Sequence, residues 1–302
     1  MITNISQLGI NISEEKLQLV ELNCTSGNCY LENIDEEYFE EVIDTETKES
    51  KFINILQNAF NEIILRKSVI SKKVSVSLPL SFFKTFEIPV EEKLTAADLN
   101  EYLKWEFSKL YPTLSEENFV IQSYVTNNSN NQIAFVFALE KSVLKIIRKF
   151  CVRNNLILKN VDNSNIASSV FLQNQPDKDK QLSVFIDNHR VSIILFSKGK
   201  FQFYKQKEYK SISELALLTK DIYNEVKERY LKYYTVSAFT LWGNVYSDKL
   251  KEQLEKTLEL TAQTINPFQK IKTETDIANK KITAENPWKF SSAMGMALRF
   301  VL

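Results

Sequence analysis

The chain has 302 residues, of which 44% are hydrophobic and 25% charged, so it is expected to fold and extensive disorder is excluded. Lys plus Arg and Asp plus Glu both number 38, which leaves no net positive charge to hold a nucleic acid. Five glycines, about 1.7% against an average near 7%, are too few for several glycine-rich phosphate loops.

The apolar runs predict a protein that does not enter the membrane. The longest, such as Ile133–Leu139, are far shorter than the roughly 18 residues that suggest a membrane span. The segment Met1–Ile10 lacks the basic start and apolar core of a targeting signal. We expect a cytoplasmic protein with no nucleic-acid partner and no direct membrane insertion.

Residues for metal or nucleophilic chemistry are scarce. Cys24, Cys29 and Cys151 form neither an even set that indicates a disulfide framework nor a pair at two-residue spacing, and His189 is the single histidine. Adjacent carboxylates on turns usually diverge in direction and lack a cleft partner. We therefore expect no catalytic residue, no metal site and no cofactor.

A three-stranded meander, an amphipathic helix and a further strand are predicted in the first 80 residues. Alternating apolar residues indicate strands at 7–12, 16–23, 29–34 and 74–80. From Ser50, apolar residues such as Phe52, Leu56 and Phe60 recur at helical spacing. Residues 32–49 contain nine Asp or Glu and one Lys, which predicts a solvated connection.

Residues 81–158 are predicted to form a separate, small α+β subdomain. A strand is expected at 82–90, a helix at 96–110, and two strands on either side of a polar turn at 126–132. A helix over 141–154 with an apolar inward face is expected to close the subdomain. A strand at 157–162 and a short helix at 165–172 follow.

After a polar segment at 173–181, the best linker candidate, the opening pattern repeats. Strands are expected at 182–187, 190–197, 200–205, 236–242 and 260–265, and helices at 212–234, 247–258 and 287–302. A meander, a helix and a strand thus occur twice in the same order, an internal duplication of architecture. Antiparallel meanders with helical crossovers predict an α/β fold of mixed sheets with helices on their faces.

Several segments match one family pattern in order along almost the whole chain. They are GINISEEKLQLVEL (9–22), VSVSLPLSFFKTFEIP (74–89), YLKWEF (102–107), VDNSNIA (161–167), the meander around Asp187, AFTLWGNV (238–245), INPF (265–268) and SSAMGMALRF (291–300). In these segments the chain resembles the PilM family, the cytoplasmic actin-like component of type IV pilus assembly. It resembles more remotely the cytoplasmic part of GspL from type II secretion.

The resemblance implies an actin-like (ribonuclease H-like) duplicated fold, with a nucleotide cleft between two mixed-sheet halves. It assigns 1–80 to the first half, completed by 159–178 and 288–302, then 81–158 to an inserted α+β subdomain and 179–287 to the second half. Only seven residues separate Tyr204 from Ile212, where the family has a further subdomain. The second half is therefore expected to lack that subdomain, and the cleft one of its walls.

The departures from the family fall where nucleotide would bind. Actin-like ATPases hold phosphates on two hairpins in which glycine permits close approach, and Mg²⁺ through an acidic residue. At the first hairpin the family's Asp and second Gly correspond to Asn11 and Ser13. Its Thr/Ser pair and its Lys correspond to Glu14, Glu15 and Gln18. Like charges about 4 Å apart repel by about 4 kcal/mol at an effective dielectric of about 20, so these carboxylates oppose a triphosphate.

The second hairpin and the third glycine site have changed as well. Asp187 is retained, but Asn188 and His189 stand where the family has Ile-Gly. The third site, a run of glycines in the family, is reduced to Gly243 after the bulky Trp242. These departures predict a degenerate nucleotide site and a protein that is not an enzyme.

We therefore expect a non-catalytic scaffold of a type IV pilus or type II secretion-like platform. Its expected partner is the cytoplasmic tail of a single-span inner-membrane protein, PilN-like or GspL/GspM-like, which would keep the chain peripheral at the inner membrane. By the resemblance, the tail is expected to contact Val76, Leu78, Phe86, Ile88, Leu99, Tyr102, Leu103 and Trp105.

Two other functions are weighed against the scaffold. The alternative is a divergent ATP-binding ATPase of the same machinery, in which Arg190 or Lys16 acts in place of the glycine loops. Actin-like polymerisation is disfavoured by the missing wall of the cleft. The sequence leaves a homodimer open.

Overall fold

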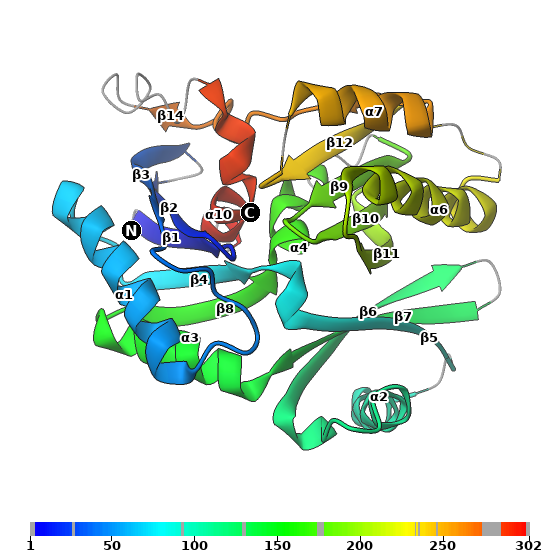
Figure 1. The fold of residues 1–302 in the computed structure, drawn as a ribbon, viewed down its shortest axis with the longest axis horizontal. Helices are drawn as coiled ribbons and strands as arrows, with labels where there is room; N and C mark the ends of the chain where they lie inside the picture. The colour runs from blue at the N-terminus through cyan, green and yellow to red at the C-terminus, as the bar shows by residue number, and fades with distance from the viewer. Residues whose placement is uncertain are drawn as a thin grey trace.

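Three β-sheets organise the chain in the computed structural model (Figure 1). The structure describes residues 4–25, 28–91, 94–128, 131–173, 178–232, 234, 236–245, 247–273 and 285–299. Residues 174–177 of the predicted linker at 173–181, and residues 274–284 of the polar stretch before residue 287, lie outside these residues. Within the described part of the chain, no helix combines the length and the apolar composition needed to cross a bilayer.

The first sheet has six strands in the order β14-β3-β2-β1-β4-β8. They are β1 (Asn4–Ile12), β2 (Lys16–Thr25), β3 (Asn28–Tyr38), β4 (Lys73–Leu78), β8 (Ile157–Asn163) and β14 (Lys272–Thr273). Helix α1 (Glu49–Arg66) packs on this sheet through the apolar stripe predicted from its spacing. Strand β14 falls in the range 179–287 predicted for the second half, yet it pairs with β3 of the first sheet.

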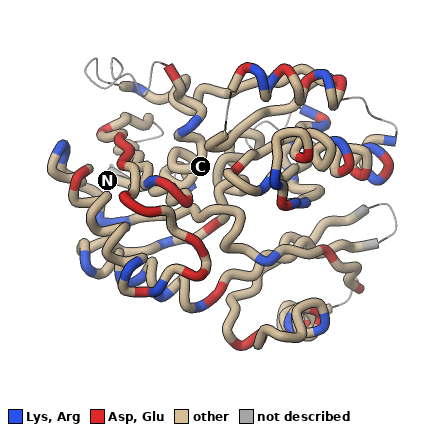
Figure 2. Tube along the Cα trace, in the orientation of Figure 1, with Lys and Arg blue, Asp and Glu red and all other residues tan. Residues whose placement is uncertain are grey.

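The acidic segment at 32–49 is not wholly the solvated connection that its charge predicts. Acidic residues follow one another along this part of the chain (Figure 2), but its first residues continue β3 as far as Tyr38. Asp35 is buried there and accepts a hydrogen bond of 2.8 Å from Arg66 of α1. Because a basic partner on the neighbouring helix compensates the charge, the strand extends beyond the predicted end at residue 34.

The second sheet repeats the design of the first, in the order β11-β10-β9-β12-β13. Its strands are β9 (Gln181–Ile186), β10 (Arg190–Ser197), β11 (Lys200–Glu208), β12 (Ala238–Gly243) and β13 (Thr261–Gln263), and its helices are α6 (Ile212–Tyr230) and α7 (Asp248–Leu258). In both sheets an antiparallel meander is followed by a helix and a strand parallel to the first. The predicted duplication is confirmed, and α6 begins four positions after Glu208 with no subdomain between them.

The third sheet has the order β5-β7-β6 and is inserted after the first half begins. Its strands are β5 (Phe83–Val90), β6 (Phe119–Asn128) and β7 (Asn131–Glu140), and α2 (Ala96–Leu110) covers one face. The opposite face meets β11, where Tyr124 stacks on Phe201 with ring centroids 4.7 Å apart. The inserted sheet therefore contacts both halves.

Helix α3 (Lys141–Arg153) does not close the inserted subdomain as predicted. It packs beside α1 and β8, with Phe150 edge-on to Phe60 at 5.4 Å between ring centroids. Asn154 and Gln57 exchange hydrogen bonds of 2.8 and 3.0 Å at the same contact. The apolar face of α3 is satisfied by α1 rather than by the inserted sheet, a choice between partners that periodicity cannot make.

Two glycines let neighbouring elements pack backbone against backbone at the centre of the first half. Helix α10 (Ser291–Leu298) follows the turn η3 (Pro287–Phe290) and packs on β1, α4 (Ser164–Ser168) and α5 (Val170–Gln173). A Cβ on Gly9 of β1 would lie 2.0 Å from the carbonyl oxygen of Ala293. A Cβ on Gly295 would lie 1.9 Å from the carbonyl oxygen of Ala167. These glycines serve close packing rather than phosphate binding.

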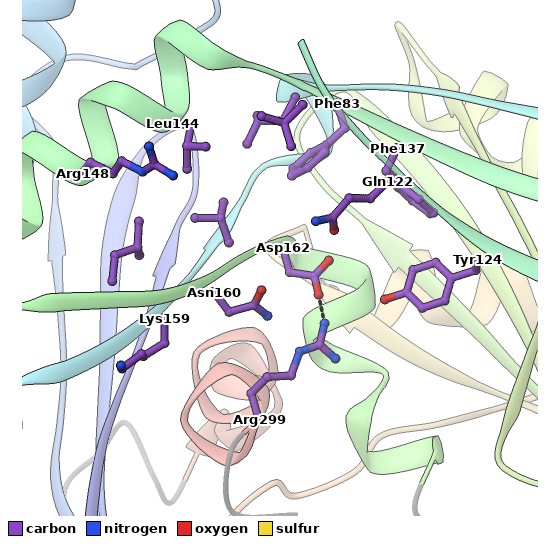
Figure 3. A pocket seen from close by; sticks show the side chains of 14 residues that line it. Phe83, Gln122, Tyr124, Phe137, Leu144, Arg148, Lys159, Asn160, Asp162 and Arg299 are labelled. Carbon is purple, nitrogen blue, oxygen red and sulfur yellow. Dashed lines mark ion pairs between the residues drawn. The ribbon is translucent and has the colours of Figure 1, made fainter. Parts of the chain in front are cut away.

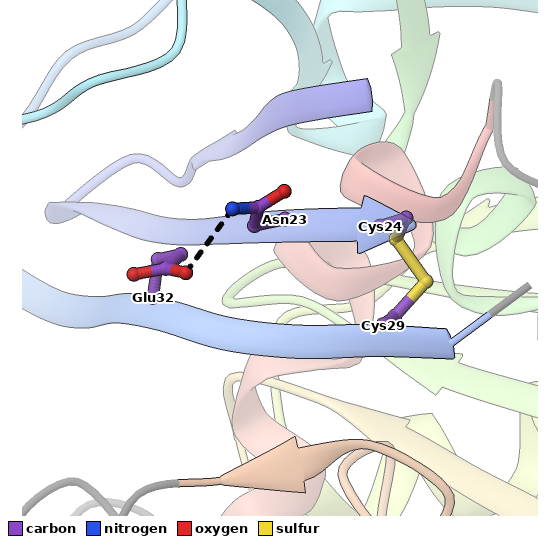
Figure 4. The surroundings of a disulfide bond; sticks show 4 residues. All are labelled: Asn23, Cys24, Cys29 and Glu32. Carbon is purple, nitrogen blue, oxygen red and sulfur yellow. Dashed lines mark hydrogen bonds between the residues drawn. A yellow bond between two sulfur atoms is a disulfide. The ribbon is translucent and has the colours of Figure 1, made fainter. Parts of the chain in front are cut away.

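Cys24 and Cys29 form a disulfide, contrary to the prediction from cysteine counting (Figure 4). Cys24 lies near the end of β2 and Cys29 near the start of β3, and the register places them opposite each other. Cys151 is buried alone in α3. The odd total concealed the pair, because one cysteine serves as a small core residue.

Candidate functional site

The β1–β2 hairpin, the first of the two that hold phosphates in actin-like ATPases, is closed here by a serine side chain. The hydroxyl of Ser13 accepts from the backbone N–H groups of Glu15 (3.3 Å) and Lys16 (3.1 Å) and donates to the Lys16 carbonyl (3.2 Å). The Ser13 N–H donates to the same carbonyl at 2.9 Å. The N–H groups that a glycine loop would offer to an anion are thus partly occupied by the turn itself.

Asn11 holds three elements together. Its carboxamide nitrogen donates to Gln18 at 3.0 Å, and its oxygen accepts from Ser77 at 2.8 Å and from Ser164 at 2.9 Å. Asn11 and Gln18 are both buried. A neutral amide therefore ties β1 to β2, β4 and α4 at the position of the family's acidic residue.

Lys16 and Gln18 meet a single carboxylate of β3. Lys16 Nζ lies 2.7 Å from Glu36 Oε2, and Gln18 Nε2 donates to the same oxygen at 2.9 Å. The Lys16 side chain is 7% exposed, so this ion pair is largely shielded from water. The Lys16 ammonium group is therefore held on the sheet, beside Glu36 of β3.

The second hairpin, β9–β10, is organised around buried Asp187. Its carboxylate accepts three hydrogen bonds, from Asn244 Nδ2 (3.0 Å), from the backbone N–H of Asn188 (3.1 Å) and from the backbone N–H of Leu80 (3.4 Å). Burial nevertheless raises the pKa of Asp187 above its ordinary value. Tyr209 donates to the Asp187 carbonyl at 2.6 Å and fastens the hairpin to the end of β11.

The two hairpins touch each other directly. Asn188 Nδ2 donates to Glu15 Oε1 at 2.9 Å, which links the turns of the two halves. Glu14, also nearly buried, accepts from the Ser81 hydroxyl at 2.8 Å. Burial raises the pKa of Glu14, and the nearby charge of Asp187 acts in the same direction.

The remaining predicted positions lie around this contact. Gly243 ends β12 with φ of 116°, and its backbone lies against Ile186 of β9. His189 is exposed, and its carbonyl accepts from the N–H of Tyr209 at 2.9 Å. Seven of the nine predicted positions thus gather where the two hairpins meet, while the hydrogen bonds described for Asn11 and Gln18 lie within the first half. Among the residues that the structure describes, no three His, Cys, Asp or Glu side chains are placed to hold a metal ion.

A cavity of about 650 Å³ lies elsewhere, between β8 and the inserted sheet (Figure 3). Its lining comes from β5, β6, β7, α3, β8 and the residue after α10: Phe83, Val120, Gln122, Tyr124, Phe137, Leu139, Leu144, Arg148, Leu158, Lys159, Asn160, Val161, Asp162 and Arg299. Asp162 and Arg299 form an ion pair at one side of the cavity. The cavity joins apolar walls to a few polar groups, as ligand-binding hollows do.

The cavity runs along an edge of the first sheet with which no other strand of the described residues pairs. β8 is the last strand of the six-stranded sheet, and five consecutive residues of it, Leu158–Asp162, line the hollow. Successive residues of a strand point to opposite faces, so a hollow that meets all five lies along the edge. Val120, Gln122 and Tyr124 are alternate residues of β6 and form the facing wall.

Comparison with known proteins finds its matches among solved structures. No protein-family model matches the sequence, and no curated protein matches it significantly. The fold matches a chain of the PilM–PilN type IV pilus biogenesis complex with a TM-score of 0.74 and 15% identity, over 98% of each chain. The chain has the actin-like fold.

Two other solved structures share this actin-like fold at a greater distance. One is a Bacteroides thetaiotaomicron protein of unknown function, with a TM-score of 0.53 and 17% identity over 87% of this chain and 91% of that one. The other is the ethanolamine utilization protein EutJ from Carboxydothermus hydrogenoformans, with a TM-score of 0.53 and 10% identity over 99% and 92%. The predicted fold class is confirmed.

The predicted partner-binding residues do not form one surface of this actin-like chain. Val76 and Leu78 are fully buried in β4, between β1 and β8, and must be removed from the prediction because no partner can reach them. Ile88 and Leu103 are also buried, where α2 packs on the inserted sheet. Phe86, Leu99 and Tyr102 pack partly buried around the same cluster. Of the eight, Trp105 alone is largely exposed, at 52%.

Two motifs of the sequence carry a signal for the cavity. Val161 and Asp162 belong to the VDNSNIA match, and Arg299 belongs to the SSAMGMALRF match. These two segments, which served as marks of resemblance, meet in the hollow. The predicted contacts in the inserted sheet and α2 lay on the α2 face of that sheet, whereas the cavity lies on its opposite face.

Proposed function

We propose that the chain is a non-catalytic actin-like scaffold of a type IV pilus or type II secretion-like platform. Its proposed ligand is the cytoplasmic tail of a single-span inner-membrane protein, bound in the cavity between β8 and the inserted sheet. The observation that supports this most is the hollow of about 650 Å³ along the unpaired edge of β8. The chain would then be cytoplasmic and peripheral at the inner membrane.

An extended peptide suits this cavity. The unpaired N–H and C=O groups of an edge strand can pair with an added strand, while neighbouring pockets select its side chains. Phe83, Leu139 and Leu158 offer an apolar wall, and the carboxylate and guanidinium of Asp162 and Arg299 can fix the register of polar groups. The neighbour of highest structural similarity described above is itself from a complex with PilN, which favours a PilN-like partner over a GspL/GspM-like one.

The contact between the hairpins supports a function without nucleotide. Lys16 and Arg190, the two cations that could replace glycine loops in a divergent ATPase, lie beside Glu36 at 2.7 Å and Glu208 at 3.3 Å. Asn11, Ser13 and Asp187 likewise have protein partners. No feature of the described residues favours the ATPase alternative over the scaffold.

The tail of the membrane partner provides the test. The chain is purified with the single-span protein encoded beside it, and that protein's cytoplasmic tail is synthesised with a fluorophore for anisotropy titrations. Gln122→Arg places a bulky cation in the cavity and is expected to weaken tail binding at least about tenfold. Val125→Arg is the matched control, because Val125 is an exposed residue of the same strand on the opposite face.

Equal weakening by the two β6 variants would contradict the cavity as the tail site. Failure of the native chain to bind any such tail, with the protein folded, would contradict the scaffold proposal itself. Melting curves of both variants exclude unfolding as the cause of lost affinity.

A further inference from the structure

Helix α3 presents a basic face to solvent. Its 13 residues contain no Asp or Glu, and its five cations are all exposed: Lys141, Lys145, Arg148, Lys149 and Arg153. The opposite face is buried against α1 and β8 through Val143, Ile146, Ile147, Phe150 and Cys151. Because the chain as a whole has no net charge, this helix is a local segregation of positive charge. Figure 2 shows the basic positions along it.

A wide hollow between α1 and α3 gathers most of these cations. Lys145, Arg148, Lys149 and Arg153 line it, together with Ile53, Val152 and the polar residues Ser50 and Asn54. Glu49 is the single carboxylate in the lining, and it pairs with Lys149 and, at 3.8 Å, with Lys145. Within the described part of the chain, no carboxylate forms an ion pair with Arg148 or Arg153. The hollow is therefore suited to anionic groups.

We propose that this basic face of α3 docks on the surface of a membrane that contains anionic phospholipid, with headgroup phosphates in the hollow between α1 and α3. Lys and Arg side chains near such a surface are attracted by its negative potential, and their contributions accumulate within a Debye length. Five cations on a helix of about 20 Å face the surface together because the buried side of α3 prevents the helix from turning.

Two features favour a lipid surface over a nucleic acid. Val152 is 75% exposed among the cations, where it can enter the headgroup region as residues of interfacial helices do. The exposed residues of α3 include no aromatic side chain, which single-stranded nucleic acid would need for stacking. A bilayer therefore fits both the charge and the apolar tip.

The position of the basic face of α3 is consistent with the proposed tail site, but the membrane proposal does not depend on that site. Arg148 lines both the hollow between α1 and α3 and the cavity beside β8. The cavity consequently opens next to the basic face. A tail that leaves the membrane would reach the cavity over a short distance when α3 rests on the bilayer.

Vesicle sedimentation with the full chain tests the proposal. The vesicles contain phosphatidylcholine alone or with 30% phosphatidylglycerol, at low and high salt. We expect the native chain to bind only the anionic vesicles and to lose this binding at high salt. We expect the affinity to fall about a hundredfold in K141A/K145A/K149A.

The control K249A/K251A/K256A removes three lysines of α7 and is expected to bind as the native chain does. Glu49→Gln removes the single acid of the hollow and is expected to strengthen binding.

The possible results separate the proposal from its rivals. Absence of binding to anionic vesicles, equal binding to both vesicle types, or equal loss in the α7 control would overturn it. So would tighter binding to a single-stranded oligonucleotide, or full competition by millimolar inorganic phosphate, which would indicate a soluble anion. The triple α3 variant retains every cavity residue, so it is expected to bind the tail peptide normally. Failure of tail binding alone would therefore affect the proposed function and leave the membrane contact standing.

Discussion

Ser164 donates a hydrogen bond of 2.9 Å to the carboxamide oxygen of Asn11, although the two residues are 153 positions apart in the chain. The same hydroxyl lies 2.9 Å from the Leu78 carbonyl oxygen, so the two acceptors share its single proton, and Ser77 also donates to the Asn11 oxygen. One buried amide thus joins β1, β4 and α4. The amide takes part in the packing of the first half at the position where the PilM family has an acidic residue.

Replacing this amide with a carboxylate is expected to destabilise the fold. Asn11→Asp buries a carboxylate that can no longer donate a hydrogen bond to Gln18 and instead faces the Gln18 amide oxygen. We therefore expect the free energy of unfolding, measured by urea denaturation at pH 7.5, to fall by about 3 kcal/mol. The loss should shrink as the pH falls and the carboxylate is protonated. Asn58→Asp, on the exposed side of α1, makes the same chemical change without burial and should change stability little. A variant as stable as the native chain, and further stabilised by Mg²⁺, would indicate a recoverable metal site.

Mg-ATP is expected to leave the melting temperature unchanged. A ligand at a hundred times its dissociation constant stabilises the folded state by about 2.7 kcal/mol, which a melting curve detects readily. The Asn188–Glu15 contact between the hairpins and the repulsion from Glu14 and Glu15 both oppose a triphosphate at the junction. Differential scanning fluorimetry with and without millimolar Mg-ATP makes the comparison, with Mg²⁺ alone as the control. A clear upward shift would favour the divergent ATPase.

Stability is expected to fall as the pH rises from mildly acid to neutral, in part because of Glu14. Burial raises the pKa of Glu14 and of Asp187, so the folded chain holds these protons more tightly than the unfolded chain. The stabilisation is complete below the ordinary pKa and is lost as the pH rises through the raised one. Glu14→Gln should flatten the dependence and stabilise the chain at neutral pH, since the Ser81 hydroxyl can still bond to the amide.

Urea titrations across this pH range compare Glu14→Gln with the native chain and with Glu101→Gln. Glu101 lies on the exposed side of α2, and its replacement should leave the pH dependence as it is. Curves for Glu14→Gln that run parallel to the native ones would show that burial does not raise the pKa of Glu14 in the folded chain.

The fold could be predicted because its patterns are local and repeated. The alternation in LQLVEL and the helical spacing from Phe52 placed β2 and α1, and the second meander repeated the first. The cavity could not be located from the sequence. The face of the sheet on which a strand residue lies depends on the register of the strand, and a shift of one position moves every side chain to the opposite face. Phe86 packs beneath α2, while Phe83 on the same strand lines the cavity. The pairing of Asp162 with Arg299 needed the three-dimensional fold, because it joins distant segments.

Gly295→Ala is expected to disrupt the first half severely. The added Cβ would lie 1.9 Å from the Ala167 carbonyl oxygen, and neither backbone can yield without moving α10 from α4. We expect a loss of more than about 3 kcal/mol in urea denaturation, or insoluble protein. Gly199→Asn is the control: Gly199 has φ of 74° in the β10–β11 turn, which asparagine tolerates, so its cost should stay below about 1 kcal/mol. Similar losses in both variants would contradict the contact between α10 and α4.

Thiol titration is expected to find one of the three cysteines. In guanidinium without reductant, Cys24 and Cys29 remain joined and Cys151 alone reacts; with reductant all three react. In the folded chain Cys151 should also be protected from iodoacetamide, because burial raises its pKa to about 12 and the thiolate is the reactive form.

Reduction of the disulfide should lower the free energy of unfolding by about 2 kcal/mol, since a short loop is released in the unfolded chain. Cys151→Ser, assayed in parallel, should leave no reactive thiol before reduction. Three reactive thiols in the unreduced, denatured native chain would mean that no disulfide joins β2 to β3.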